Sequence, residues 1–227
     1  MGKKRNLPLG FRVRAVIGFV ASCFCVGVLG TVFLNLLSER SYRYQPNPIS
    51  TVRVFDDSGH GSGVHIGDGY ILTMAHVVAE MKTVKVRASD NYEAPATVLW
   101  SNTAYDVALL RTPLRRMDKV PLRCDLSPLK TGDAIEAVGN PYQLEFVHTY
   151  GKVSSAVRKS TTALQVYMAN IVVLPGMSGG PVFDSLHRLT GLVHAVMTAS
   201  VGMFGGSPVP LSYIVPVSSA CALMGRD

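Results

Sequence analysis

Short apolar runs separated by turn residues fill the chain from Thr51 onward. Glycine, aspartate, asparagine or proline stands between most of these runs, and few stretches show a helical period. This pattern is typical of an all-β barrel or sandwich. A helical turn is predicted at His76–Met81 and a short helix at Val217–Met224. The predicted strands are Thr51–Phe55, Gly63–Ile66, Tyr70–Ala75, Thr83–Arg87, Thr97–Trp100, Val107–Leu110, Ala134–Val138, Val147–Val157, Ala163–Met168, Pro181–Phe183, Thr190–Met197 and Ser212–Val215.

A much longer apolar run, Ala15–Leu37, precedes this region and contains no charged residue. A helix needs about 20 apolar residues to cross the hydrocarbon core of a bilayer, so the run predicts a single transmembrane anchor. Five positively charged residues precede it and only two follow closely. The positive-inside rule therefore places the N-terminus in the cytoplasm and the rest of the chain outside it, in the periplasm of a bacterium.

Two other interpretations of this run stay open. A cleaved secretory signal normally has a shorter apolar stretch, and no convincing cleavage site follows Leu37. Val20–Cys23 resembles a bacterial lipoprotein processing box with Cys23 as the lipidated residue, although hydrophobic sequence continues beyond it. The flanking residues are predicted to be a basic cytoplasmic segment, 1–14, and an extended, proline-containing linker, 38–50.

The formal net charge of +7 belongs almost wholly to the N-terminal part. Residues 1–50 hold seven lysines and arginines against one glutamate, whereas residues 51–227 hold fifteen against fourteen acidic residues. Because the β-rich part is nearly neutral, no nucleic-acid-binding surface is predicted.

The decapeptide Leu174–Phe183 (L-P-G-M-S-G-G-P-V-F) carries the strongest chemical signal. Ser178 stands among three glycines, and a serine hydroxyl becomes a nucleophile when a general base takes its proton. The oxyanion that develops needs backbone N–H groups in a tight turn, which Gly176 and Ser178 are predicted to supply. A non-catalytic glycine loop has the same composition, so the interpretation requires a base elsewhere in the chain.

A candidate base and a candidate orienting group both lie upstream. His76 follows the predicted strand Tyr70–Ala75, and Asp106 opens the apolar run Val107–Leu110. A carboxylate beside such a run needs a hydrogen-bond partner. An imidazole N–H would satisfy it and would fix the tautomer that base catalysis needs. Taken singly, the histidine can equally be structural and the aspartate a turn residue.

The chain order His76, Asp106, Ser178 is similar to that of chymotrypsin-type serine proteases. Gly59–Val78, Gly132–Val157 and Pro175–Phe183 resemble the corresponding stretches of the HtrA/DegP branch of the trypsin-like family. This resemblance implies two six-stranded antiparallel β-barrels with an active site in the cleft between them.

The resemblance also implies a domain organisation and an activity. The protease domain would span residues 51–227 and divide near residues 111–130. The chain would be a serine endopeptidase acting on polypeptides, with Ser178 as nucleophile, His76 as base and Asp106 as orienting carboxylate. No cofactor is expected. The alternative is a latent or non-catalytic protease-like scaffold that binds peptides.

Distance from the serine along the chain predicts the substrate pocket. Its floor would fall at Val172 and its wall at His194, Ala195 and Val196. None of these residues is acidic, so small or medium aliphatic side chains are expected in place of lysine or arginine. His194 falls near the position where a small polar residue usually contacts the triad carboxylate; an ordinary strand histidine is the other interpretation.

Several features set limits on this resemblance. Met177 stands where trypsin carries an aspartate that pairs with a newly cut N-terminus, so that mode of activation is not expected. No PDZ-like segment is expected after the last predicted strand, and the oligomeric state stays open. His60, His65, His148 and His187 lack metal-ligand spacing, so no metal site is expected. Cys124 and Cys221 can pair in an oxidising compartment, but the sequence does not place them within reach.

Overall fold

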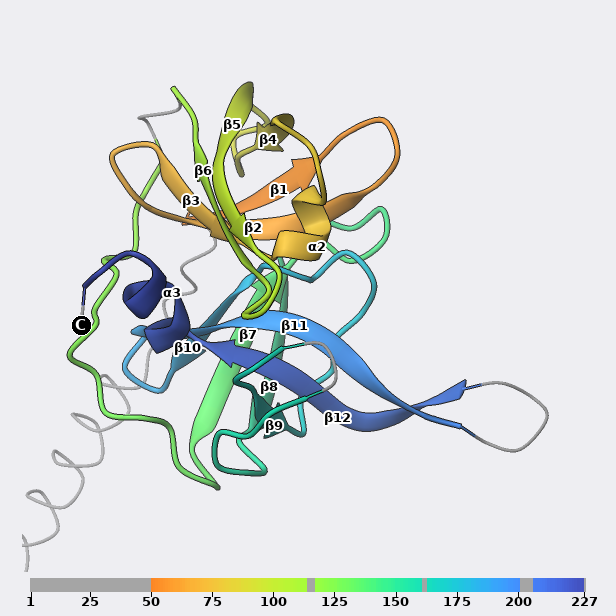
Figure 1. Ribbon diagram of the computed structural model, residues 1–227. Helices are drawn as coiled ribbons and strands as arrows, with labels where there is room; N and C mark the ends of the chain where they lie inside the picture. The colour runs from red at the N-terminus through yellow and green to blue at the C-terminus, as the bar shows by residue number, and fades with distance from the viewer. Residues whose placement is uncertain (1–49, 114–116, 161–162, 201–205, 227) are drawn as a thin grey trace, which may run out of the picture. The chain divides into compact units, whose positions relative to one another are not determined.

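The structure is a computed structural model that describes residues 50–113, 117–160, 163–200 and 206–226 (Figure 1). Its strands form two six-stranded antiparallel sheets, which confirms the predicted all-β architecture of the protease domain. The predicted segment 1–14, the anchor Ala15–Leu37 and all of the linker except Ser50 lie outside the described residues. Within the described part, no helix is both long and apolar enough to cross a membrane.

The first sheet closes into a barrel in the order β1-β2-β3-β6-β5-β4. Buried and exposed positions alternate along its strands, as in β4, which turns Val84 and Val86 inward and its other residues outward. The barrel closes where β1 pairs with β4. Its elements are β1 (Thr51–Phe55), β2 (His60–Gly67), β3 (Tyr70–Thr73), the one-turn helix α2 (Ala75–Val78), β4 (Thr83–Arg87), β5 (Glu93–Asn102) and β6 (Val107–Arg111).

The second sheet has the order β8-β7-β10-β11-β12-β9. Its two ends meet at an isolated bridge between Val153 and Ala169, so the sheet is barrel-like. The predicted strand continued to Val157, but β8 ends at Lys152, because Val153 makes only this isolated bridge to β9. The elements are β7 (Ala134–Gly139), β8 (Val147–Lys152), β9 (Tyr167–Ala169), β10 (Pro181–Asp184), β11 (Leu189–Ser200), β12 (Gly206–Pro216) and the helix α3 (Val217–Leu223).

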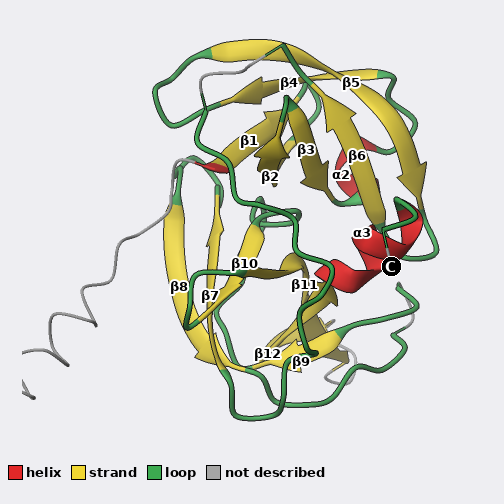
Figure 2. Cartoon of the chain, turned by 90° about the vertical axis from the view of Figure 1, so that its left-hand side faces the viewer, coloured by secondary structure: helices red, strands yellow, loops and turns green. Residues whose placement is uncertain are grey.

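Figure 2 shows the sheet β1–β6 and the sheet β7–β12 as two separate layers of strands. Three apolar clusters form the core of the domain. One fills the first barrel and another fills the second. The third joins them, because it contains Leu72 and Met74 from the first sheet and its flank together with Phe183 and Leu192 from the second. Burial of such side chains is the main stabilising contribution to a domain of this kind. The shared cluster therefore fixes the two sheets relative to each other.

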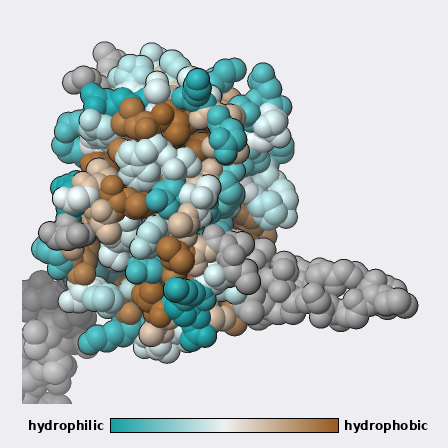
Figure 3. Space-filling model, in the orientation of Figure 1, coloured by the Kyte–Doolittle hydropathy of each residue, from teal (hydrophilic) through white to brown (hydrophobic). Residues whose placement is uncertain are grey.

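Apolar residues also reach the surface, but in separate places. On the face shown in Figure 3, brown patches are divided by hydrophilic side chains. Among the described residues the most exposed large apolar side chains belong to different loops, as Leu186 and Val172 do. Singly exposed apolar residues are normal on protein surfaces. This face therefore suggests no large docking surface.

Cys124 and Cys221, which the sequence left unassigned, form a disulfide across 97 residues. It ties the connection between the two barrels to helix α3. We expect that reduction, or the Cys124→Ser/Cys221→Ser double substitution, lowers the free energy of unfolding by about 2–5 kcal/mol. Denaturant unfolding followed by the fluorescence of Trp100, the single tryptophan, measures this effect. An unchanged midpoint after complete reduction would contradict it.

Candidate active site

His76 and Asp106 meet at the end of the first barrel because β3 and β6 are neighbouring strands. His76 lies in α2, which follows β3, and Asp106 directly precedes β6. The His76 ring atom Nδ1 lies 2.6 Å from Asp106 Oδ2. The backbone N–H of His76 donates to the other carboxylate oxygen, Oδ1, at 2.9 Å. The carboxylate therefore holds both the ring and the backbone of the histidine.

The environment keeps Asp106 ionised. Its side chain is only 7% exposed, whereas that of His76 is 46% exposed. Burial by itself raises the pKa of this carboxyl group. Hydrogen bonds from His194 and His76 outweigh burial and lower the pKa of Asp106 to about 2. A carboxylate in this state orients the His76 ring with Nδ1–H toward itself and leaves Nε2 to act as a base.

The low pKa of Asp106 predicts an acid-dependent contribution to stability. The carboxylate stabilises the fold fully above its ordinary pKa near 3.8, and this contribution is lost as the pH falls toward 2. We expect the difference in unfolding free energy between the wild type and Asp106→Asn to shrink by about 2 kcal/mol between pH 5 and pH 2. Urea unfolding at several pH values measures this difference, and a constant value would contradict the prediction.

Ser178 lies on the loop before β10, against the first barrel. Its carbonyl oxygen accepts a hydrogen bond from the N–H of Ser62 at 2.7 Å. Its hydroxyl donates to the carbonyl oxygen of His194 at 3.0 Å. Within the described residues, no hydrogen bond joins this hydroxyl to the His76 ring. The serine is thus beside the His76–Asp106 pair but rests in a different hydrogen bond, and a rotation about χ1 would be needed to redirect it.

The loop that precedes Ser178 presents two backbone N–H groups. Gly176 adopts a positive φ of 97°, which glycine accepts without strain. Among the described residues, neither the N–H of Gly176 nor that of Ser178 has a hydrogen-bond acceptor. The Tyr142 N–H donates to the Pro175 carbonyl at 3.0 Å. Because a trans peptide directs its N–H opposite to its C=O, this bond also sets the direction of the Gly176 N–H.

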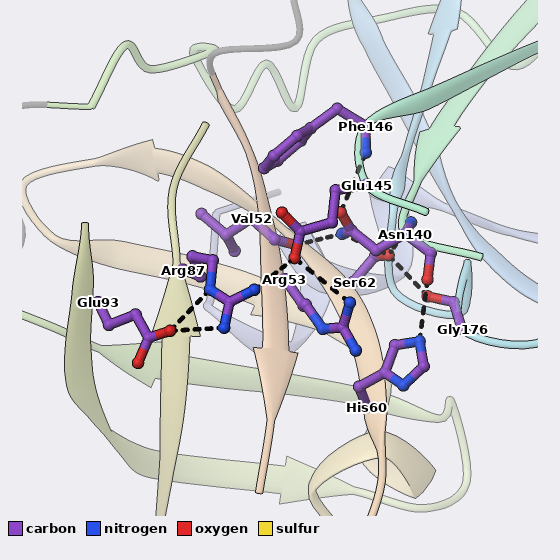
Figure 4. A network of polar contacts seen from close by, with 10 residues as sticks. All are labelled: Val52, Arg53, His60, Ser62, Arg87, Glu93, Asn140, Glu145, Phe146 and Gly176. Carbon is purple, nitrogen blue, oxygen red and sulfur yellow. Dashed lines mark hydrogen bonds and ion pairs between the residues drawn. The ribbon is translucent and has the colours of Figure 1, made fainter. Parts of the chain in front are cut away.

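A buried polar network holds the same loop from the other side (Figure 4). The Ser62 hydroxyl donates to the Gly176 carbonyl at 2.8 Å and accepts from the backbone N–H of Asn140 at 2.9 Å. The Asn140 carbonyl in turn accepts a hydrogen bond from His60 Nε2 at 3.0 Å. These residues belong to stretches already quoted from the sequence, yet their positioning role was missed. Only their contacts across the two barrels reveal it.

Ion pairs anchor the loop between β7 and β8 to the first barrel. Glu145 Oε1 lies 2.7 Å from Arg87 and 3.3 Å from Arg53, and Arg87 also pairs with Glu93 at 2.6 Å (Figure 4). Asn140 and Tyr142 lie on the same loop. The two pairs of Glu145 are partly buried, so solvent screens them less than exposed pairs. They therefore help to keep the supports of Gly176 in place.

The residues predicted for the substrate pocket lie in different surroundings in the structure. His194 and Ala195 line a cleft of about 590 Å³ beside His76 and Asp106, which Ala79, Glu80, Ser101 and Thr103 also line. Val172 is 61% exposed, while its neighbours Ile171 and Val173 are buried in the second barrel. The alternation of the chain turns the Val172 side chain to the surface, and a pocket floor at Val172 stays a prediction. Val196 lies on β11 opposite Ser212, and its side chain lies outside the described part.

Two six-stranded antiparallel barrels, with a serine and a histidine–aspartate pair where they meet, define the chymotrypsin-like class of proteins. The chain matches the family described as "Trypsin-like peptidase domain" over residues 61–192. It therefore belongs to the trypsin-like peptidase family.

Known proteins support the predicted similarity to the HtrA/DegP branch. The chain is 32% identical over 185 residues to a "Probable periplasmic serine endoprotease DegP-like" of Pseudomonas putida, covering 80% of this chain and 38% of that protein. The protein of the same description from Halomonas elongata is 33% identical over 198 residues, covering 85% and 40%. The chain thus spans less than half of the length of these relatives.

A solved structure shows the same fold. The "HtrA-type protease AlgW with tripeptide" superposes with a TM-score of 0.68 at 25% identity, covering 79% of this chain and 60% of that one. The resemblance predicted from the sequence is therefore confirmed by relatives and by a structural neighbour.

Proposed function

We propose that this chain is a serine endopeptidase that hydrolyses peptide bonds in polypeptides. Ser178 attacks the scissile carbonyl while His76 takes its proton, and Asp106 orients His76 and stabilises its protonated form. The N–H groups of Gly176 and Ser178 hold the oxyanion. Water then hydrolyses the acyl-enzyme with His76 again as base. The observation that carries the proposal is the contact of 2.6 Å between His76 Nδ1 and Asp106 Oδ2, next to a loop with two N–H groups that have no acceptor among the described residues.

We also propose a location and a substrate preference. The apolar run Ala15–Leu37 would anchor the chain, with residues 51–227 outside the cytoplasm. The periplasmic relatives and the disulfide, which persists in oxidising compartments, support this location. A preference for small or medium aliphatic residues is supported by Ala195 in the cleft and by the absence of acidic residues at Ile171–Val173.

A latent or non-catalytic peptide-binding scaffold is the second candidate. The hydrogen bond from the Ser178 hydroxyl to the His194 carbonyl favours it, because this bond holds the nucleophile away from its base. Under this alternative, the site would require an activating partner or would carry out no chemistry.

A fluorophosphonate probe separates the two candidates, since it reacts covalently with an activated serine. The full chain, purified in detergent, is labelled and the modified residue is mapped by mass spectrometry. We expect modification at Ser178 that is lost in His76→Ala. A folded protein that stays unlabelled, also in membranes, would overturn the peptidase proposal.

A further inference from the structure

The carboxylate of Asp106 is shared by two histidines. Its Oδ2 atom lies 2.6 Å from Nδ1 of His76 and 2.8 Å from Nδ1 of His194. The two rings are tilted by 57° with their centroids 5.7 Å apart, so they converge on the carboxylate without stacking. One ligand atom from each of the three side chains lies within 4.8 Å of the others. The residues are far apart in sequence, and no ligand spacing could reveal them.

The three side chains form a donor set typical of transition metals. Two imidazole nitrogens and one carboxylate oxygen suit Zn²⁺, Co²⁺ or Ni²⁺, whereas Mg²⁺ and Ca²⁺ prefer oxygen ligands. Open zinc sites commonly use three protein ligands and leave a fourth position for water. We propose that His76, Asp106 and His194 form a binding site for a divalent transition metal of the zinc class, and that its occupancy switches off the catalytic base.

The cleft gives an ion access to these ligands. All three residues line the same space of about 590 Å³, although His194 and the Asp106 side chain are only 4% and 7% exposed. Glu80 lines the same cleft, and among its described lining residues no lysine or arginine is present. Two carboxylates and no fixed positive charge favour entry of a cation.

Binding requires the three ligand atoms, which lie within 4.8 Å of one another, to rearrange around the ion. Metal–ligand bonds of about 2.0–2.1 Å in tetrahedral geometry separate the ligand atoms by roughly 3.3 Å. The two nitrogen–oxygen distances of 2.6 and 2.8 Å would therefore open by about 0.7 and about 0.5 Å, and a separation of 4.8 Å would close by about 1.5 Å. The His76 side chain is 46% exposed, so its ring has room to make this movement.

The inhibitory effect follows from the tautomer of His76 and rests on the proposed function. A neutral imidazole carries one ring proton, and a metal on Nδ1 leaves that proton on Nε2. The ring then has no lone pair with which to accept the Ser178 proton. The His76 ring keeps its proton when the metal binds, because this proton moves from Nδ1 to Nε2. Asp106 stays ionised.

Calorimetric titration of the full chain with Zn²⁺ tests the site. The protein carries Ser178→Ala, which removes no ligand, and is purified without a polyhistidine tag. We expect one site whose affinity falls roughly 100-fold or more in His194→Thr. His194→Asn serves as a second variant in case the first is unstable. His148→Gln is the matched control, since His148 contacts Glu136 in the other described histidine–carboxylate cluster, and it should leave the affinity unchanged.

The remaining outcomes are equally decisive. Absence of Zn²⁺ binding at micromolar concentrations overturns the proposal. It is also overturned if both His194 variants bind Zn²⁺ as tightly as the protein that carries Ser178→Ala alone. A loss of Zn²⁺ affinity confined to His148→Gln overturns it as well, because the metal would then bind at the Glu136 cluster.

A second experiment tests the inhibitory part. With Ser178 intact, Zn²⁺ should block fluorophosphonate labelling and EDTA should restore it. Binding without any effect on labelling overturns the inhibitory part. Absence of labelling without metal disproves the peptidase function and leaves the titration result standing.

Discussion

Replacement of Ser178 by alanine is expected to lower kcat/KM for peptide hydrolysis by roughly 10⁴- to 10⁶-fold. The reason is that the hydroxyl alone forms the acyl-enzyme, while the groups that remain provide binding and oxyanion stabilisation. His76→Ala should cause a loss of similar size. The double variant should fall no further, because the nucleophile and its base act as one unit. Initial rates with an unfolded polypeptide and with a fluorogenic peptide measure these effects.

Ser155→Ala provides the matched control for this prediction. Ser155 is a buried serine whose hydroxyl, like that of Ser178, donates to a backbone carbonyl, here that of Ala156 at 2.9 Å, but it lies outside the site. The same chemical change there should leave the rate within a few-fold of the wild type. Retention of activity in Ser178→Ala would contradict the proposed nucleophile. Equal losses in both serine variants would indicate damage to the fold instead.

The fold was predictable because each strand carries its own signal. Turn residues separate the apolar runs, and the alternation in segments such as Thr83–Arg87 has the period of a strand with one buried face. Strand ends were less predictable. Val153–Val157 is apolar enough to extend β8, but the partner strand offers only an isolated bridge at Val153. Pairing between distant segments, which the local pattern does not encode, sets these limits.

The pairing of His76 with Asp106 was predictable from the free energy that it costs to desolvate a carboxylate without a hydrogen-bond partner. A carboxylate at the start of an apolar strand needs a donor, and the neighbouring strand β3 delivers one. The direction of the His194 ring and the resting position of the Ser178 hydroxyl were not predictable. Both depend on how β11 packs against the first barrel, and this contact joins residues that are distant in the sequence.

Distance along the chain does not give the surroundings of a side chain or its separation from another residue in space. Counting back from Ser178 predicted a pocket floor at Val172, and the structure adds that this side chain is exposed between the buried Ile171 and Val173. The same limit applies to the disulfide, because the sequence separation of 97 between Cys124 and Cys221 gives no measure of their separation in space. Local patterns therefore predicted the elements and the chemistry, while the long-range geometry required the structure.

Substitution of Gly176 by alanine is expected to lower kcat by about 10²- to 10³-fold, with a smaller change in KM. A Cβ atom here would overlap with the Asn140 carbonyl oxygen and with His60 Nε2. The positive φ of 97° adds strain for any residue with a side chain. Because Asn140 is fully buried and tied to Ser62, it cannot easily retreat. The loop must move instead, and the Gly176 N–H leaves the position from which it stabilises the oxyanion.

Gly132→Ala separates backbone strain from crowding. Gly132 has a nearly identical φ of 96°, but an added Cβ would meet nothing within 4 Å. Both variants should therefore lose about 1–2 kcal/mol of stability from strain, and only Gly176→Ala should lose the rate of oxyanion formation. Steady-state kinetics together with thermal unfolding of the two variants measure this difference. Equal kcat values would show that the Gly176 N–H does not stabilise the transition state, since the ground-state fold tolerates the same strain elsewhere.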